Sequence, residues 1–459
     1  MELSKKKLIR LSHDIVIREW KDKKLLLIPK KSNDKRDTIA IDNPTAVSII
    51  KAINDNGKND LENIIRIIKK EWKNVDNKDI KDFIVQLSEL GYIQDISNSD
   101  TTLKNNTLVS DRFEYLSKSS NNPVHLSIEL TRRCNFICPF CYTRLNTINY
   151  TEASLNDYYR ILSEAIDLGV VEFTLSGGEI LLRPELIYNL VPFLAKKGTK
   201  INLFTNASLL EKYPNIVDII AEYAPNIEIT MYAITLEKHK AITGHDINSV
   251  FRGIECLLRN NIKPALKTTV SKDNVDEIDL INQYAISNNL EYRYDFLLVR
   301  RPDKKKNGIE EQRLTPNQIC EKEICDRQRS MWLKSRKKEL VKDNFSNSSE
   351  NLPFFHCEAG ISSGFVGSDL RYSVCCLIRQ QKYTYDLTCR TLHDAFNEYT
   401  KSIRNINNNK KNECNKCSIF NLCLYGGCPA QVLNQDYQDT EYFCRVAKAR
   451  AKRMFEMEF

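Results

Sequence analysis

The chain lacks the long apolar segments of membrane proteins and secreted precursors. No apolar run among its 459 residues approaches the length of a membrane span. The first ten residues, MELSKKKLIR, have no apolar stretch of the kind found in signal peptides. We therefore predict a cytoplasmic protein without a membrane span.

The sequence also lacks a nucleic-acid-binding motif and a concentrated block of one charge. Its net charge of +8 is spread along the chain. A Lys-rich solvated surface explains this charge most simply, although the charge would also suit an acidic partner peptide. We therefore predict no nucleic-acid partner.

Cysteine, by contrast, is abundant. The chain contains 15 Cys, and disulfides are unexpected in the reducing cytoplasm, so clustered Cys are better explained as metal ligands. At 459 residues with 42% hydrophobic content, the chain should fold into two or three globular domains.

The first cysteine cluster is CNFICPFCY, in which Cys134, Cys138 and Cys141 have the spacing C-x3-C-x2-C. It directly follows the alternating apolar stretch 124–130, which predicts a β-strand. Three thiolates on one loop can hold three corners of a [4Fe–4S] cube and leave the fourth iron open to a small molecule. A structural zinc site would need a fourth local ligand, and no Cys or His follows nearby.

This spacing, followed by the aromatic residue Tyr142, resembles the radical S-adenosylmethionine (SAM) superfamily. The resemblance implies that SAM chelates the open iron and that an electron from the cluster cleaves SAM to a 5′-deoxyadenosyl radical. It makes Cys134, Cys138 and Cys141 the catalytic residues, and it places Tyr142 at the cofactor.

Strands and helices alternate from residue 124 to about residue 297. Strands are expected at 124–130, 172–175, 200–204, 227–231, 265–270 and 291–295. Amphipathic helical stretches between them include 184–196, 250–259 and 275–288. Repeated strand–helix units give an α/β fold with a parallel sheet. Six units resemble the partial (β/α)6 barrel of radical SAM enzymes, in which chemistry occurs at the carboxyl ends of the strands.

Two motifs follow predicted strands at that end. SGGEI contains Gly177, Gly178 and Glu179, which match the superfamily's GGE motif for the SAM amino group. The two glycines would let the backbone approach a ligand closely. FTNAS contains Thr205 and Asn206, which match a TNG stretch near SAM, with Ala207 in place of the usual Gly.

Two further residues are assigned to SAM on weaker similarity. Thr230 begins TMYAITLEKHKAITG, which resembles the superfamily's SLYG…HD-ITG segment, where a SAM-contacting Ser is common. His239 in this segment is expected to be a helix-surface histidine. Arg293, on the sixth strand, would pair either with the SAM carboxylate or with an ordinary ion-pair partner.

The N-terminal part contains three short strand candidates and then three helices. The strands are expected at 14–20, 24–28 and 38–41, and apolar stripes predict helices over 47–53, 61–72 and 80–90. Asn43-Pro44 predicts the start of the first helix and Gly91 the end of the third.

This order resembles the PqqD-like domain, or RiPP recognition element, over residues 8–95. Domains of that family bind the leader of a ribosomally made precursor peptide. A leader would add as a strand at 38–41, and the nearby basic residues would favour an acidic leader. These residues are Lys30, Lys31, Lys35 and Arg36. A DNA-binding winged helix and a purely structural domain are the alternatives.

The second cysteine-rich region lies in the C-terminal third. It resembles the SPASM domain of peptide-modifying radical SAM enzymes, which carries two auxiliary [4Fe–4S] clusters. The resemblance implies two ligand sets. One set is Cys414, Cys417, Cys423 and Cys444, and the other is Cys357, Cys375 and Cys428. Cys376, Cys389 or the substrate would complete the second set.

Two departures from the SPASM pattern occur. The block C-x2-C-x5-C-x4-C has x4 where x3 is usual, and Leu370 replaces the usual Gly five residues before Cys375. Two zinc sites are the alternative, because thiolate spacing does not separate zinc from iron. Cys256, Cys320 and Cys325 are expected to be unligated.

Together the resemblances predict five regions. These are a leader-binding domain (1–95), a linker (96–121), a radical SAM core (122–300), a charged connector (301–350) and a SPASM domain (351–459). The expected activity is modification of a ribosomally synthesised precursor peptide, with a thioether crosslink as the first choice. The expected electron donor is an external protein of the flavodoxin or ferredoxin type.

Three alternatives to this activity are kept. One is a carbon–carbon or other crosslink in a peptide. Another is maturation of a sulfatase or of a quinone-cofactor precursor. An Fe–S redox sensor that binds DNA is an alternative of a different class.

Overall fold

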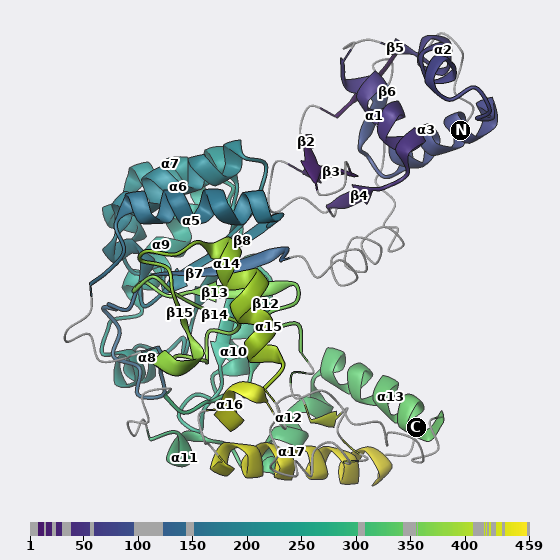
Figure 1. Cartoon of the computed structure of the whole chain (residues 1–459). Helices are drawn as coiled ribbons and strands as arrows, with labels where there is room; N and C mark the ends of the chain where they lie inside the picture. The colour runs from purple at the N-terminus through teal and green to yellow at the C-terminus, as the bar shows by residue number, and fades with distance from the viewer. Residues whose placement is uncertain are drawn as a thin grey trace.

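The computed structural model shows an N-terminal domain, a central barrel and a C-terminal region that returns to the barrel (Figure 1). The structure describes residues 8–12, 15–20, 24–29, 38–55, 59–95, 123–143, 151–301, 308–342, 355, 357–406, 417, 419, 422–423, 428–433 and 437–456. The predicted linker, 96–121, and Cys414 lie outside these residues, as do the basic residues Lys30, Lys31, Lys35 and Arg36.

The three strands and three helices predicted for the N-terminal domain are all present. The strands β2 (Ile15–Trp20), β3 (Lys24–Pro29) and β4 (Ile39–Ile41) form an antiparallel sheet, which we call the wing. The helices are α1 (Pro44–Asp55), α2 (Leu61–Glu71) and α3 (Asn77–Glu89). Apolar residues of these helices and of the wing pack together in a hydrophobic core that belongs to this domain.

A second small sheet in this domain was not predicted. It pairs β1 (Leu8–Leu11) with β5 (Asn59–Asp60) and β6 (Ile93–Asp95). These strands have two to four residues, which is too short for a recognisable alternation.

Local signals at the ends of the helices act as predicted. The Asn43 Oδ1 accepts hydrogen bonds from the backbone N–H of Thr45 (2.9 Å) and of Ala46 (3.2 Å), at the start of α1. Gly91 follows α3 with φ = 76°, a left-handed conformation that favours glycine.

The six predicted barrel strands form one parallel sheet. They are β7 (His125–Thr131), β8 (Glu172–Gly177), β9 (Lys200–Thr205), β10 (Asn226–Thr230), β11 (Ala265–Thr269) and β12 (Tyr292–Asp295). The connecting helices are α5 (Leu155–Leu168), α6 (Pro184–Lys196), α7 (Pro214–Tyr223), α8 (Leu236–Thr243), α9 (Asn248–Arg259) and α10 (Ile278–Ser287). Short turns of 3-10 helix follow β8 (η1, Ile180–Leu182) and β9 (η2, Leu210–Lys212). The predicted partial (β/α)6 barrel is confirmed.

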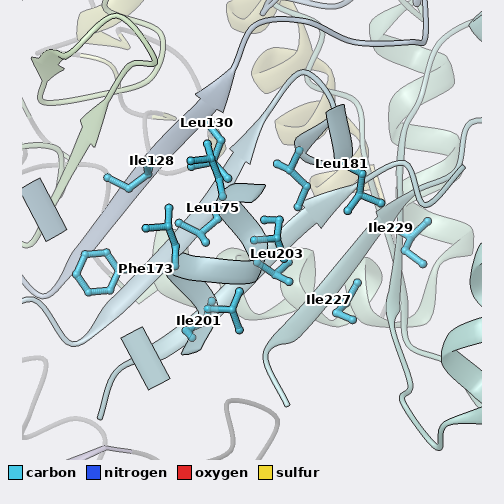
Figure 2. Packing of buried hydrophobic residues seen from close by; sticks show 14 of the residues in the cluster. Ile128, Leu130, Phe173, Leu175, Leu181, Ile201, Leu203, Ile227 and Ile229 are labelled. Atoms are coloured by element: carbon cyan, nitrogen blue, oxygen red, sulfur yellow. The ribbon is translucent and has the colours of Figure 1, made fainter. Parts of the chain in front are cut away.

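The two faces of this sheet differ in chemistry. Alternate residues such as Ile128, Phe173, Leu203 and Ile229 pack in the main apolar core (Figure 2). The opposite face carries polar side chains, including a 2.7 Å hydrogen bond from Asn202 Nδ2 to Glu172. The protein's own side chains therefore make the inside of the barrel polar.

The wing packs against the amino ends of the barrel strands. Trp20 packs with Val171 at the start of β8, and its indole N–H donates to the Gly169 carbonyl (3.1 Å). The Arg18 guanidinium donates to the carbonyls of Val170 (2.8 Å) and Ile166. A cation thus satisfies backbone carbonyls at the carboxyl end of α5, where a helix has unpaired acceptors and partial negative charge.

The C-terminal region extends the barrel sheet, which the sequence did not predict. Strand β13 (Ser363–Val366) pairs parallel to β7, and β14 (Arg371–Ser373) and β15 (Tyr385–Asp386) follow it antiparallel. The remaining elements are α11 (Ile309–Gln312), α12 (Pro316–Cys325), α13 (Arg327–Lys342), η3 (Gln381–Tyr383), α14 (Leu392–Asp394), η4 (Ala395–Tyr399), α15 (Thr400–Arg404), α16 (Pro429–Leu433) and α17 (Tyr437–Glu456). Within the part of the chain that is described, no helix has the length and apolar character to cross a membrane.

The contact between wing and barrel gives a first prediction. Trp20→Ala should destabilise the docked N-terminal domain by about 3 kcal/mol, because large-to-small changes of a buried Trp typically cost that much or more. Calorimetry should then resolve a separate, lower-temperature transition. Trp20→Phe keeps most of the packing and should lose only about 1 kcal/mol with the indole hydrogen bond. An unchanged single transition in Trp20→Ala would show that this contact does not hold the domain.

Candidate functional site

The cysteine loop leaves the carboxyl end of β7 and is fixed by neighbouring loops. Asn206, after β9, donates to Asn135 Oδ1 (2.9 Å), and Asn135 Nδ2 donates to Ser208 (2.8 Å). The backbone N–H of Ile137 donates to the Thr243 carbonyl at the end of α8 (2.9 Å). The loop after β9 and the carboxyl end of α8 therefore set the course of the loop that carries Cys134, Cys138 and Cys141.

The glycines of the GGE motif pack against this loop. The N–H groups of Gly178 and Glu179 donate to the carbonyls of Thr131 (2.8 Å) and Arg133 (2.9 Å). A Cβ at Gly177 would lie 2.3 Å from the Thr131 oxygen, and one at Gly178 would lie 2.1 Å from the Arg133 oxygen. The close backbone approach expected here is thus made to the chain's own cysteine loop.

Glu179 joins two strands. Its carboxylate is fully buried and accepts hydrogen bonds from the Leu181 N–H (3.0 Å), the Thr205 hydroxyl (2.7 Å) and the Asn206 N–H (2.7 Å). Burial nevertheless raises the pKa of this carboxyl, although the three donors act in the opposite direction. A cationic group beside Glu179 would therefore relieve an unfavourable buried charge.

Both residues that replace an expected glycine, Ala207 and Leu370, keep the backbone that glycine would adopt. Ala207 has φ = 60° and Leu370 has φ = 57°, both in the left-handed region. The non-glycine residues therefore accept a strain of about 1–2 kcal/mol each. Ala207 is also enclosed, because a Cβ on Gly253 of α9 would lie 2.1 Å from its carbonyl oxygen.

The three thiols of the loop lie close enough to affect one another. Partial desolvation by the surrounding loops, with contributions from Glu179 and Cys141, raises the pKa of Cys134 to about 12, although the residue is exposed at the surface. Burial and the two neighbouring thiols raise the pKa of Cys138 further. Such thiols stay protonated until a metal supplies positive charge, and cluster binding would deprotonate them. In the described part of the chain, no three His, Cys, Asp or Glu are grouped around a single ion, but a cube needs only one thiolate at each iron.

Two aromatic residues at the loop were not predicted. Phe140 is buried and packs edge-to-face on Tyr232, with ring centroids 5.1 Å apart. Tyr232 follows β10 and lies beside the Cys138 thiol, which it hydrogen-bonds. The run of aromatic residues in CNFICPFCY was the available signal, but the sequence does not show which ring faces which partner.

Tyr142 connects the cysteine loop with the C-terminal region. Its hydroxyl donates to the Cys376 Sγ (3.9 Å), and Arg379 Nε donates to the Cys376 carbonyl (2.6 Å). The same Arg379 makes two hydrogen bonds, of 2.9 and 3.1 Å, to the buried Glu129 of β7. Hydrogen bonding to Cys375 and the charge of Arg379 lower the pKa of the Cys376 thiol to about 6.

The weaker assignments have mixed outcomes. Thr230 is the last residue of β10 and is half-buried at the same end of the barrel. Arg293 forms an ion pair with Glu228, which is the ordinary alternative raised for it, and its side chain is 62% exposed. His239 was expected on the helix surface, and this expectation was wrong. It is fully buried, its Nδ1–H donates to the His245 carbonyl (3.0 Å), and its ring packs edge-on against Phe136 of the cysteine loop.

The described cysteines of the C-terminal region fall into two places. Cys375 and Cys428 pack in one small apolar cluster, and the Cys357 carbonyl nearby accepts from Arg404 (3.1 Å). The Cys423 thiol donates to the carbonyl of Phe443 (3.6 Å), the residue before Cys444. The two ligand sets implied by the sequence are therefore separate in space as far as the described residues show, and thiol-rich sites of this kind suit iron–sulfur clusters or zinc.

Comparison with known families decides the class of the barrel. The model of the radical SAM superfamily matches residues 128–281. This part of the chain is a radical SAM domain. The prediction of a radical SAM enzyme is confirmed at the level of the superfamily, whose members use SAM and a [4Fe–4S] cluster.

The match in sequence to curated relatives covers only part of each relative's length. The chain is 30% identical over 185 residues to a GTP 3′,8-cyclase of Clostridium botulinum (strain Okra / Type B1), covering 38% of this chain and 57% of the cyclase. The cyclase of Clostridium perfringens (strain SM101 / Type A) is 30% identical over 197 residues, covering 40% and 58%. The chain thus spans somewhat more than half the length of the curated relatives it matches.

Solved structures extend the similarity in fold to nearly the whole chain. Streptococcus suis SuiB bound to its precursor peptide SuiA has a TM-score of 0.60 at 17% identity, and the match covers 93% of this chain and 96% of SuiB. The enzyme anSMEcpe with bound AdoMet and a peptide has a TM-score of 0.50 at 16% identity, covering 73% and 97%. At these identities the similarity establishes the fold.

Glu179 gives a prediction with a defined pH dependence. Because folding raises its pKa, Glu179 stabilises the fold relative to Glu179→Gln most below its usual pKa of 4.5, and this advantage should decline as pH rises through the raised value. Denaturant unfolding of both proteins across this range measures the difference. The exposed carboxylate at the start of α6 supplies the control, Glu185→Gln. A constant difference between wild type and Glu179→Gln at every pH would contradict the prediction.

Proposed function

We propose that the protein is a radical SAM peptide maturase that forms a thioether crosslink in a ribosomally synthesised precursor peptide. The observation that carries the proposal is the combination, in one chain, of the radical SAM cysteine loop, a docked wing domain and a cysteine-rich C-terminal region that extends the barrel sheet. The match in fold to SuiB includes all three parts, and that protein binds a precursor peptide.

In this proposal the cysteine loop holds the catalytic cluster through Cys134, Cys138 and Cys141. The bound cluster and SAM would supply a 5′-deoxyadenosyl radical. The residues assigned to SAM are Tyr142, Gly177, Gly178, Glu179, Thr205, Asn206 and Thr230, and Arg293 would join them only by leaving its ion pair with Glu228. Glu179 would receive the SAM ammonium, which offsets the cost of its buried carboxylate. The Asn135–Asn206 bond would hold the loop and the SAM site in register.

The C-terminal cysteines would hold two auxiliary clusters. Cys357, Cys375 and Cys428 form one set, and Cys414, Cys417, Cys423 and Cys444 form the other. For the first set, Cys376 is adjacent in sequence, but its thiol already contacts Tyr142 and lies near Arg379. This contact favours an iron left open to the substrate thiolate, and a cysteine thiolate is the nucleophile that a thioether requires.

The substrate class is the point at which the relatives differ. The cyclases resemble this chain over a length comparable to the radical SAM domain, so the similarity in sequence does not extend over all three parts. The wing supplies a feature that a nucleotide substrate would not use. Strand β4 is at the edge of the wing sheet, and a sheet edge can accept an extended peptide as a further strand. We therefore favour a peptide over a nucleotide.

The activity is tested by incubating the anaerobic, reduced protein with SAM and a Cys-containing precursor peptide. The expected product has lost two hydrogen atoms per crosslink, and tandem mass spectrometry should locate a bond from a Cys sulfur to carbon. Replacing Cys134, Cys138 or Cys141 by Ala should abolish both the crosslink and 5′-deoxyadenosine, because one of three protein ligands is lost. Cys256→Ala on α9 is the control and should retain both.

Two outcomes of this experiment would count against the proposal. In a parallel incubation with SAM and a guanine nucleotide, conversion of the nucleotide, with no change in the peptide, would favour the cyclase class. A carbon–carbon bond in the peptide would retain the peptide substrate and reject the thioether.

The leader-binding role of the wing gives a separate prediction. If an acidic leader adds at β4, Lys35→Glu with Arg36→Glu should weaken leader binding at least tenfold. Less peptide should then be modified at low peptide concentration. Fluorescence anisotropy of a labelled leader with the full chain measures the affinity. The same charge change in Lys69→Glu with Lys70→Glu, at the end of α2, is the matched control. Equal effects of both pairs would indicate non-specific attraction to a basic surface.

A further inference from the structure

A small cavity lies between the catalytic end of the barrel and one set of C-terminal cysteines. Its volume is about 120 Å³. Asp295 and Phe296 at the end of β12 line one side, and Cys423, Phe443 and Arg450 line another. Arg329 of α13 also lines it. The helices α12, α13 and α17 that surround this region lie together beneath the barrel (Figure 1).

A buried ion pair holds Arg450, which lines the cavity. Arg450 of α17 donates to both oxygens of Glu323 of α12, at 2.8 and 2.6 Å. Arg450 is 6% exposed and Glu323 is 1% exposed. Arg329 approaches the same carboxylate at 3.4 Å and lies over the Tyr294 ring. Two guanidinium groups therefore share one carboxylate, which leaves one positive charge in excess within this group of three.

The same arginine holds the cysteine segment. Arg450 Nη1 donates to the Leu422 carbonyl (3.1 Å), directly before Cys423. The Cys423 thiol in turn lies against the Phe443 carbonyl, directly before Cys444. Arg450 thus fixes the backbone that presents Cys423 to the cavity, and it brings its charge to the same place.

Two carboxylates outside this group, Asp295 and Asp326, lie at or near the cavity. Asp295 lines the cavity, and its carboxylate lies 3.6 Å from Lys267 Nζ. Asp326, further along, accepts a 3.0 Å hydrogen bond from Tyr294. Asp326 also accepts from the Arg329 backbone N–H (2.9 Å), so its carboxylate offsets the charge of Arg329 and leaves Arg450 as the buried cation that lines the cavity with Cys423.

We propose that Arg450, positioned by Glu323, raises the reduction potential of the auxiliary cluster that Cys423 and Cys444 hold. The inference rests on the proposed function, because it needs a cluster at these cysteines. Reduction adds negative charge to a cluster, and a buried cation nearby stabilises that charge with little screening by water. Net charge, hydrogen bonds and solvent exposure are the means by which proteins set such potentials.

The test measures potentials with the catalytic cluster removed. The background is the full chain with Cys134, Cys138 and Cys141 replaced by Ala, titrated anaerobically and followed by electron paramagnetic resonance. The couple that disappears in Cys423→Ala identifies the cluster concerned. Neither peptide nor SAM is present, so the result does not depend on turnover.

The two charges of the pair should act in opposite directions. Glu323→Gln removes a negative charge and should raise the potential. Glu323→Gln combined with Arg450→Met should lower it relative to Glu323→Gln alone by about tenfold in the reduction equilibrium, or about 59 mV for one electron. Arg450→Lys keeps the charge and should stay within threefold of the background. Arg453→Met, one turn along α17 at an exposed ion pair, is the control and should change nothing.

Iron analysis distinguishes failure of this inference from failure of the proposed function. Unchanged potentials in Glu323→Gln and the double variant, with iron retained, would overturn this inference alone. Loss of the same iron from Arg450→Lys would also overturn it, since the arginine would then act only in building the site. Absence of C-terminal iron from the background protein, with zinc in its place, would refute the auxiliary cluster of the proposed function and this inference with it.

Discussion

The central constraint is the close contact between the turn after β8 and the cysteine loop after β7. The carbonyls of Thr131 and Arg133 lie where the Cβ atoms of Gly177 and Gly178 would be, so only glycine allows the two segments to meet. Two backbone hydrogen bonds cross this contact, and Glu179 extends it to the end of β9. A single rigid unit therefore positions the three thiols relative to the barrel.

A second buried connection ties this unit to the C-terminal region. Glu129 of β7 is 1% exposed, and it binds Arg379 as well as Ser368 from beyond β13. Removing one partner of such a pair leaves an uncompensated buried charge, which typically costs about 3–5 kcal/mol. Arg379 also donates to the Cys376 carbonyl, and the Cys376 thiol accepts from Tyr142, so the cysteine loop is joined to the C-terminal region.

The wing is placed at the other end of the barrel. Its contacts with Gly169 and Val171 lie at the start of β8, whereas the cysteine loop lies beyond the carboxyl end of β7. A strand of six residues spans about 20 Å. Under the proposed function, a leader held by the wing of the same chain must therefore be followed by at least about six extended residues before the modified position.

Much of this could be predicted from local patterns. The alternation in 124–130 and the repeated strand–helix units predicted the parallel barrel, because strand and helix periods are local properties. The cysteine spacing and the motifs after strands predicted which residues gather at one end, since parallel strands end at the same edge. The capping signals at Asn43 and Gly91 were read correctly for the same reason.

Only the tertiary structure decided which side chains meet. Partners distant in sequence surround His239, Tyr142 and Arg450. No local pattern encodes such partners. The addition of β13 beside β7 joins residues more than two hundred positions apart. Sequence fixes the chemistry available at each position through residue type and local period, whereas long-range packing decides burial and therefore which charges, rings and thiols act on one another.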